Sequence, residues 1–261
     1  MIILFRSCEA NLSPSSIGDS AQDKKNKPRW NGHNKLEILR KCYKSIQTGL
    51  EATDKIVIVN DRTSDETLDW METNTITDFS EVDITSLDIL RKNHLYPDYH
   101  PAAPNECTEL METLLKIADD NPEEIIYVCE DDYLHTDYAI LAMKRLFDKG
   151  YEGFYAPYDY PDRYTVDTNK VTQVYAGPYS HLRNIPSATL TLAAKGKLWS
   201  RYRYEILRAG VFADDSWTWK AFAQVGAVCP IPSHATHLQD GCISPYIDWQ
   251  AIYNNININD A

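Results

Sequence analysis

Apolar and polar positions along the first half of the chain follow the pattern of strands alternating with helices. Short apolar runs at 2–5 and 55–60 have the length and composition of buried strands. Between them an apolar stripe repeats at alternating steps of three and four, which predicts a helix over about 34–50. The stripe consists of Leu36, Leu39, Tyr43, Ile46 and Leu50. Thr63 and Glu66 have the spacing of a capping box, so a second helix is expected after the strand at 55–60.

The alternation continues through the middle of the chain. Residues 105–120 carry apolar side chains at helical spacing, and Asn121-Pro122 ends that helix before the apolar run 125–129. A further helix over about 137–149 ends at Gly150. Strand and helix in turn are typical of βαβ units, so the pattern predicts an α/β fold with a mostly parallel central sheet flanked by helices.

The second half has a weaker pattern. It predicts a strand at 154–157, a β-hairpin over 164–176 around Asp167-Thr168-Asn169, and a strand at 187–194. A helix over 215–225 is closed by Gly226, and the last 35 residues read as loops. Residues 7–34 are polar and too long for an ordinary connection, which favours a loop that covers a substrate. We expect one domain over 1–261, with halves 1–135 and 136–261.

Charge and composition exclude several partners. The formal net charge is −12, whereas a protein that binds a phosphate backbone needs clustered Lys and Arg, so nucleic acid is not an expected partner. No window approaches the length of a membrane span, and MIILFR lacks the features of a leader peptide, so we expect a cytoplasmic protein. Its six cysteines form no C-x-x-C pair, which favours reduced thiols in the core.

Carboxylates follow two of the predicted strands directly. Asp61 comes after the strand at 55–60, and Glu130, Asp131 and Asp132 come after the run at 125–129. In an open parallel sheet, ligands bind outside the carboxyl ends of the strands, so these four side chains should meet in one cleft. Like charges at such spacing favour a hard cation, and Mg²⁺ or Mn²⁺ held by one or two carboxylates completes its shell with substrate phosphates. The alternative for EDD is a solvated strand end or an N-cap for the next helix.

Two further stretches carry a resemblance to a known family. The turn from Val59 to Thr67, VNDRTSDET, resembles the V-D-D-x-S-x-D-x-T turn of nucleotide-sugar glycosyltransferases with the A-type fold. Residues 212–219, FADDSWTW, are similar to the acidic pair and aromatic helix start of its inverting members, and EDD resembles the family's Asp-x-Asp motif. The resemblance covers about 1–230. Glu130 stands where the family has Asp, Asn60 replaces an acidic residue, and Arg62 takes a place often held by glycine.

This resemblance implies a metal-dependent hexosyltransferase that uses a UDP-sugar and inverts its anomeric configuration. Residues 1–135 would form the nucleotide-binding half, and a smaller β-hairpin region in 136–261 would face the acceptor. Asp61 would bind the base or ribose, with Arg6, Ser7 and Arg62 lining that pocket, and Asp131 or Glu130 would take a ribose hydroxyl. A surface ion pair with Glu9 is the alternative for Arg6.

The resemblance also implies metal-binding and catalytic residues. Asp132, with Glu130, would bind Mn²⁺ or Mg²⁺, and His237 is preferred over His234 as an added ligand. Asp215 would be the base that removes the acceptor's proton, and Asp214 would position the acceptor. An ordinary helix N-cap is the alternative for Asp215.

Two other classes of function stay open on the sequence. A nucleotidyltransferase also uses carboxylate-held Mg²⁺, but no Gly-rich phosphate loop follows the first strand. A non-catalytic sugar-binding protein would hold only a structural ion, and it would not need the pair Asp214-Asp215.

Overall fold

The structure is a computed structural model that describes residues 1–9, 30–84, 105–164, 172–189, 191–212 and 217–258. The strands are β1 (Ile2–Ser7), β2 (Lys55–Asn60), β3 (Asp78–Asp83), β4 (Ile125–Glu130), β5 (Tyr133–His135), β6 (Phe154–Tyr155), β7 (Val174–Ala176), β8 (His181–Asn184), β9 (Leu192–Lys195), β10 (Ala227–Ile231) and β11 (Ala235–His237). The helices are α1 (Lys35–Gln47), α2 (Asp65–Thr73), α4 (Asn105–Asp120), α5 (Ala139–Asp148), α6 (Gly196–Arg201), α7 (Arg203–Phe212), α8 (Trp217–Val225) and α9 (Trp249–Asn255), with 3-10 turns η3 (Trp30–Gly32) and η4 (Pro161–Tyr164).

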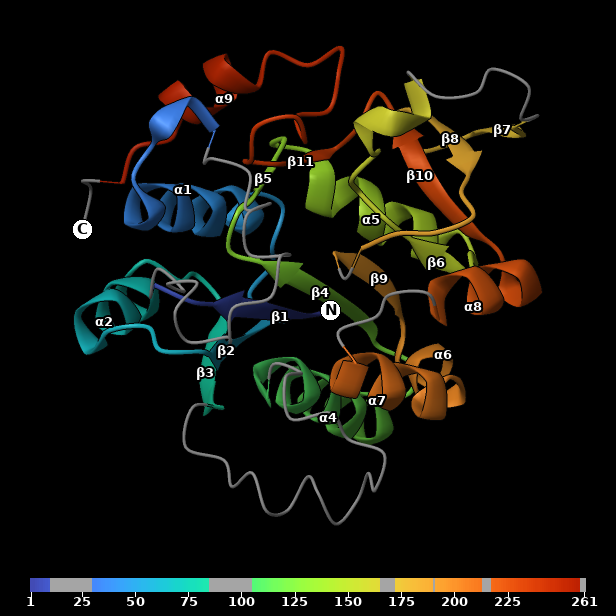
Figure 1. Cartoon of the computed structure of the whole chain (residues 1–261), viewed down its shortest axis with the longest axis horizontal. Helices are drawn as coiled ribbons and strands as arrows, with labels where there is room; N and C mark the ends of the chain where they lie inside the picture. The colour runs from blue at the N-terminus through green and yellow to red at the C-terminus, as the bar shows by residue number, and fades with distance from the viewer. Residues whose placement is uncertain (10–29, 85–104, 165–171, 190, 213–216, 259–261) are drawn as a thin grey trace.

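Within the described residues, one mixed sheet runs through the molecule in the order β3-β2-β1-β4-β9-β6-β10-β8-β7 (Figure 1). The first four strands are parallel, and their register pairs Arg6 with both Val59 and Glu130. The ends of β1, β2 and β4 therefore lie level at one edge. The predicted α/β class is confirmed, and three of the four parallel strands were predicted, whereas β3 at the edge of the sheet was not.

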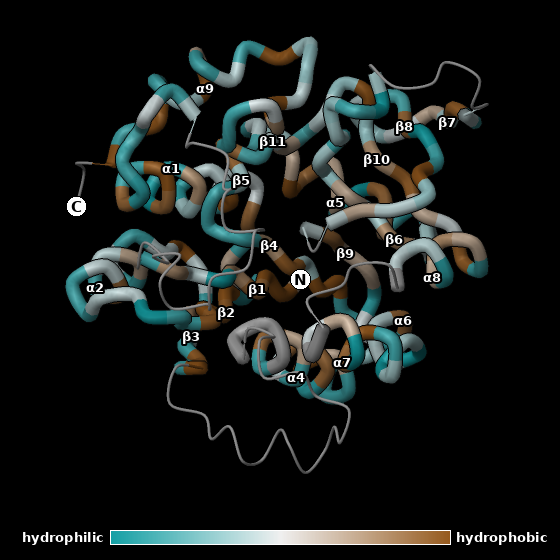
Figure 2. Tube along the Cα trace, in the orientation of Figure 1, coloured by the Kyte–Doolittle hydropathy of each residue, from teal (hydrophilic) through white to brown (hydrophobic). Residues whose placement is uncertain are grey.

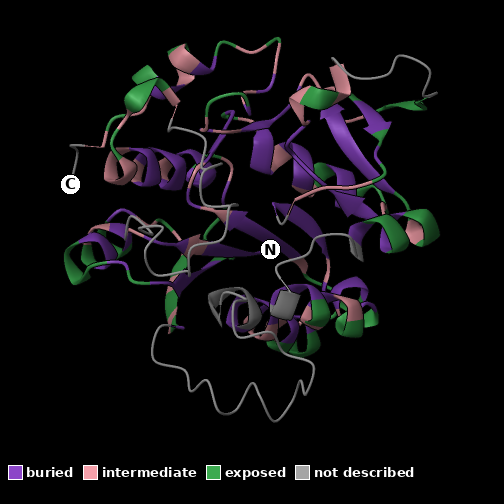
Figure 3. Ribbon diagram, in the orientation of Figure 1, coloured by how far each residue is buried: buried purple, intermediate pink, exposed green. Residues whose placement is uncertain are grey.

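Helices cover both faces of this sheet because residues along each strand alternate between two cores. Ile2 and Leu4 pack with α4, α6 and α7 on one face, whereas Ile3 and Phe5 pack with α1, α2 and α5 on the other. Hydrophobic residues gather along β1, β2 and β4 (Figure 2), and the same strands are largely buried (Figure 3). Strands with apolar residues on both faces are typical of a sheet that helices cover on both sides.

The other half of the sheet departs from the predicted parallel pattern. β9 is antiparallel to β4 and β6, and β8 is antiparallel to β10 and β7. Of the predicted hairpin over 164–176, the turn at 167–169 lies outside the described residues. Val174–Ala176 pairs with His181–Asn184, and Tyr164 ends a 3-10 turn, so the predicted hairpin partner was wrong.

Three other local predictions were corrected. Ser64, not Thr63, caps α2 by accepting a hydrogen bond from the Thr67 amide, because Thr63 turns inward to Ser7. The strand predicted at 187–194 is β9, which begins at Leu192. The last 35 residues are not only loops, since they contain β10, β11 and α9. These elements are short and depend on partners far away in the sequence.

Candidate functional site

The carboxyl ends of β1, β2 and β4 come together around Arg6. Its Nη2 lies 2.8 Å from Asp61 Oδ2, and its Nη1 lies 3.2 Å from Glu130 Oε1. Arg6 therefore joins the ends of three adjacent strands, and Glu9 contacts Ser64 instead of Arg6. Burial raises the pKa of the Glu130 carboxyl, Arg6 opposes the shift, and the nearby charge of Asp132 adds to it.

Asp61 is fully buried and has both carboxylate oxygens in ion pairs. Oδ2 accepts from Arg6, while Oδ1 accepts from Arg62 Nε at 3.0 Å and lies 2.9 Å from Arg62 Nη2. Its backbone amide donates to the carbonyl of Ser7 at 2.8 Å. The carboxylate that the family resemblance assigns to the nucleotide is thus turned toward two arginines.

Asp131 anchors two segments that precede the site in the sequence. One of its oxygens accepts a hydrogen bond from the Cys8 amide at 2.7 Å, and the other pairs with the Lys35 ammonium at the start of α1. Burial raises the pKa of Asp131, and Lys35 acts in the opposite direction. Asp131 therefore fixes the end of β1 and the beginning of α1 beside β4.

Asp132 faces His237 across the small sheet of β5 and β11. The Asp132 Oδ2 to His237 Nε2 distance is 3.2 Å, and the His237 ring stacks on Tyr133 with centroids 4.8 Å apart. Burial lowers the pKa of His237, but the hydrogen bonds to Asp132 and Cys242 and the charges of Asp132 and Glu130 together outweigh burial and raise that pKa to about 10. The two side chains are an ion pair near neutral pH, so a metal that bound His237 would displace its proton.

The second candidate histidine lies elsewhere. His234 is buried, with Nδ1 2.8 Å from the Tyr155 hydroxyl, and burial lowers its pKa to about 4. The proposed base Asp215 and its neighbour Asp214 lie outside the described residues. Ser7, the remaining predicted residue, is buried and shares a 2.7 Å hydrogen bond with Thr63.

The donor set fits a cation that also binds substrate. In the described part of the chain, no group of three or more His, Cys, Asp and Glu side chains is placed to hold a metal ion. Asp132 and His237 supply one carboxylate and one imidazole in close contact. Two protein donors suit a hard divalent ion that takes its other ligands from a diphosphate and water.

Three residues of this site were not predicted. Lys35 pairs with Asp131, Tyr133 stacks on His237, and Thr63 bonds to Ser7. Of these, Tyr133 had a signal in the sequence, because it directly follows EDD on the same strand end. For Lys35 and Thr63 there was no signal in the sequence except that both lie in or next to predicted helices or strands.

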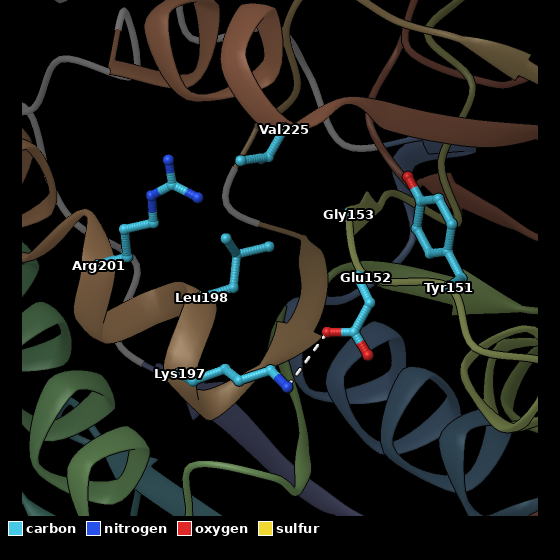
Figure 4. A pocket seen from close by; sticks show the side chains of 7 residues that line it. All are labelled: Tyr151, Glu152, Gly153, Lys197, Leu198, Arg201 and Val225. Carbon is cyan, nitrogen blue, oxygen red and sulfur yellow. Dashed lines mark ion pairs between the residues drawn. The ribbon is translucent and has the colours of Figure 1, made fainter.

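A separate pocket of about 620 Å³ lies at the opposite edge of the sheet. It is formed where β6 and β10 begin, and Lys197 pairs with Glu152 at 3.2 Å along its wall (Figure 4). Glu152 also pairs with Lys195 at 2.8 Å. This pocket shares no residue with the acidic site.

Comparisons with known proteins give a fold likeness without a family. No protein-family model matches the sequence, and no curated protein matches it. Among solved structures, S. aureus TarS in complex with UDP-GlcNAc has a TM-score of 0.43 and 11% identity over 90% of this chain and 57% of the TarS chain. The galactosyltransferase LgtC with donor and acceptor sugar analogs has a TM-score of 0.42 and 10% identity over 88% of this chain and 73% of the LgtC chain.

A candidate glucose-1-phosphate thymidylyltransferase from Bacillus anthracis, in complex with sucrose, is also similar. Its TM-score is 0.47 with 14% identity, over 98% of this chain and 95% of that chain. The match to TarS, by contrast, covers little more than half of the length of the TarS chain. At such scores and identities the likeness does not indicate an activity, which must come from the residues of the site. No helix in the described residues has the length and apolar character of a membrane span.

Proposed function

We propose that this protein is a metal-dependent glycosyltransferase that moves a sugar from a nucleoside diphosphate sugar, with UDP as the nucleotide, to an acceptor hydroxyl. One observation carries the proposal. Arg6, Asp61, Glu130 and the pair Asp132–His237 meet at the carboxyl ends of parallel strands. β1 lies between β2 and β4, so the chain reverses its strand order between β1 and β4. Ligands of open α/β sheets bind at such a switch point.

The diphosphate belongs on the β4 side of that point. Asp132 and His237 would hold a divalent cation there, together with diphosphate oxygens. The bound cation would offset the negative charge that develops on the diphosphate as the glycosyl bond breaks. Glu130, which is part-exposed beside Arg6, is placed to accept a hydrogen bond from a ribose hydroxyl.

The assignment of the residues that act on the acceptor comes from the resemblance of residues 212–219 to the acidic pair of inverting glycosyltransferases. Asp215 comes two residues before α8 in the sequence, and a helix start in general favours an ionised carboxylate. In the proposed inverting transfer, Asp215 takes the proton of the acceptor hydroxyl while that oxygen attacks the anomeric carbon from the face opposite the nucleotide. Asp214 positions the acceptor. An NMR spectrum of the first product formed should show the inverted anomer, and a retained anomer removes Asp215 from this role.

The decisive experiment is a calorimetric titration of UDP into the protein with Mn²⁺ and then with EDTA. Micromolar affinity that is lost with EDTA is the expected result. Release of UDP from a UDP-sugar supports glycosyl transfer, whereas release of pyrophosphate from a nucleoside triphosphate and a sugar phosphate would indicate a nucleotidyltransferase. No binding of any nucleotide overturns the proposal.

Asp132→Ala tests the metal assignment. We expect at least a tenfold loss of Mn²⁺-dependent UDP affinity with a native circular dichroism spectrum, because the variant lacks the cation's carboxylate ligand. Asp148→Ala, which changes an exposed carboxylate at the end of α5, is the matched control. Equal affinity in the two variants excludes Asp132 from the metal site.

A further inference from the structure

The turn that follows β11 returns the chain to His237. β11 ends at His237, and the Cys242 amide then donates to the Gln239 carbonyl at 3.0 Å, which closes a tight turn. Gly241 in this turn has a φ of 76°, in the left-handed region that glycine adopts without strain. The Cys242 thiol forms a hydrogen bond with the His237 side chain. The turn therefore places a thiol beside the imidazole that faces Asp132.

Two tyrosines hold this arrangement in place. Tyr158 donates its hydroxyl to the Cys242 carbonyl at 2.6 Å, and its ring packs edge-on against Tyr133, with centroids 5.4 Å apart. Tyr133 in turn stacks on the His237 ring. Tyr133, Tyr158 and Cys242 are all buried. The His237 ring thus contacts an aromatic face and a thiol, and Tyr158 links these two neighbours to each other.

A cation held by His237 needs the lone pair of one particular ring nitrogen. Nε2 is the atom that faces Asp132, at 3.2 Å, so a cation bound by both side chains takes the lone pair of Nε2. A neutral imidazole carries its one proton on either nitrogen, and Nε2 is free for a cation only when the proton is on Nδ1. Histidines that bind metals usually donate this second N–H to a neighbour, which fixes the orientation of the ring and the position of the proton.

We propose that Cys242 is a positioning residue for His237, with its sulfur accepting a hydrogen bond from Nδ1–H and leaving Nε2 on the side of Asp132. The inference rests on the proposed function and adds to its cation site a residue that is not itself a ligand. A thiol sulfur is a weak acceptor, but Cys242 is buried, and a hydrogen bond is stronger where water does not screen it.

Calorimetric titration of Mn²⁺ into the protein in the presence of UDP tests this inference. Cys242→Ala should weaken the Mn²⁺ affinity about tenfold or more, because the ring of His237 loses the contact that orients it. Cys242→Ser, whose hydroxyl also accepts a hydrogen bond, should regain most of that loss. Cys42→Ala is the matched control, since it removes a fully buried thiol from α1 that packs in one cluster with Leu238, and it should bind Mn²⁺ as the wild type does.

A second variant keeps the test decisive if C242A does not fold. Tyr158→Phe leaves the thiol in place and removes the hydroxyl that holds the Cys242 carbonyl. It should weaken the Mn²⁺ affinity by a smaller factor than C242A, because the thiol is then less firmly placed. Wild-type Mn²⁺ affinity in both Y158F and C242S, with C242A unfolded, would mean that Cys242 serves the fold alone.

Four other outcomes overturn the inference. If C242A and C42A weaken Mn²⁺ equally, the loss of buried sulfur is the cause. If C242S regains nothing, the hydrogen bond is not what matters. If Co²⁺ in place of Mn²⁺ gives a sulfur-to-cobalt charge-transfer band that C242S lacks, Cys242 is a ligand. If C242A binds Mn²⁺ and UDP as the wild type does, Cys242 has no role while the proposed function stands.

Failure of the proposed function gives a different result. In that case the wild type binds no nucleotide with Mn²⁺, and the inference about Cys242 fails with it.

Discussion

His135 shows how burial sets the behaviour of a single residue. Its ring is buried, with Nε2 2.6 Å from the Tyr127 hydroxyl, and its backbone amide donates a hydrogen bond to Ser45 Oγ at 3.1 Å. Burial lowers the pKa of His135 to about 3, because a charged ring would lose its hydration. The folded protein therefore keeps a neutral imidazole in β5, within the small sheet that also carries His237.

This depressed pKa predicts a pH dependence of stability. In the unfolded chain His135 takes up a proton near pH 6.5, whereas in the folded protein its pKa is about 3. The stability that comes from the neutral folded ring is therefore complete above about pH 6.5 and is lost as the pH falls toward 3. Between pH 7.5 and pH 4.5 the loss should be about 3 kcal/mol. Urea unfolding of His135→Gln should show a pH dependence that is weaker by that amount. His181→Gln, at an exposed position of β8, is the control, and an equal slope in H135Q and wild type contradicts the prediction.

At the scale of elements, Lys41 attaches the last helix to the first. Lys41 lies buried on α1, and its Nζ donates to the carbonyl oxygens of Tyr253 at 2.7 Å and Ile256 at 3.0 Å. These carbonyls belong to the C-terminal end of α9, where a positive charge also interacts favourably with the helix dipole. Ile38 and Cys42 of α1 pack with Trp249 and Tyr253 of α9. Figure 1 shows α1 and α9 in the same part of the molecule.

Replacing Lys41 should loosen α9 without disturbing the central sheet. We expect Lys41→Met to cost about 1–2 kcal/mol, because two buried carbonyls lose their donor. Hydrogen exchange should show faster exchange of the α9 amides, while β1 and β4 remain protected. Lys44→Met on the same helix is the matched variant. Unchanged protection of α9 in K41M would mean that apolar packing alone holds this helix.

At the scale of the whole molecule, Asp159 connects segments of the second half that the sequence pattern left unassigned. Its fully buried carboxylate pairs with Arg163 of η4 at 3.1 Å and with Arg183 of β8. Its backbone amide donates to Ser233 Oγ at 2.8 Å, and its carbonyl accepts from Ser244 Oγ at 2.6 Å. The charge of Asp159 therefore links the η4 turn to β8, and its backbone hydrogen bonds link both to Ser233 and Ser244.

Asp159→Asn should lower the free energy of unfolding by about 3 kcal/mol, because two largely buried guanidinium groups lose their counter-ion. Denaturant titration measures the loss. Glu205→Gln, which breaks the exposed pair with Lys220, should change stability by less than about 1 kcal/mol. If the two substitutions cost the same, water or other groups compensate the arginines and Asp159 is not the organising charge.

The sequence by itself determined three of the four parallel strands and the edge where the acidic residues gather, but not the edge strand β3. The apolar runs of β1, β2 and β4 and the stripe of α1 are local patterns, and local patterns can be read without knowing the neighbours. The position of EDD after β4 followed from the same reading. The strand pattern placed Asp61 and Asp132 at one edge before any contact was known, and the family resemblance added Arg6.

Only the tertiary structure decided which partner each of these side chains meets. Arg6 reaches Asp61 across 55 residues, Lys35 reaches Asp131 across 96, and His237 reaches Asp132 through the pairing of β5 with β11. Strand order and register fix such contacts, and neither leaves a periodic signal in the sequence. The left-handed φ of Arg62 is decided in the same way, because hydrogen bonds from β1 and from Asn60 close the turn around it.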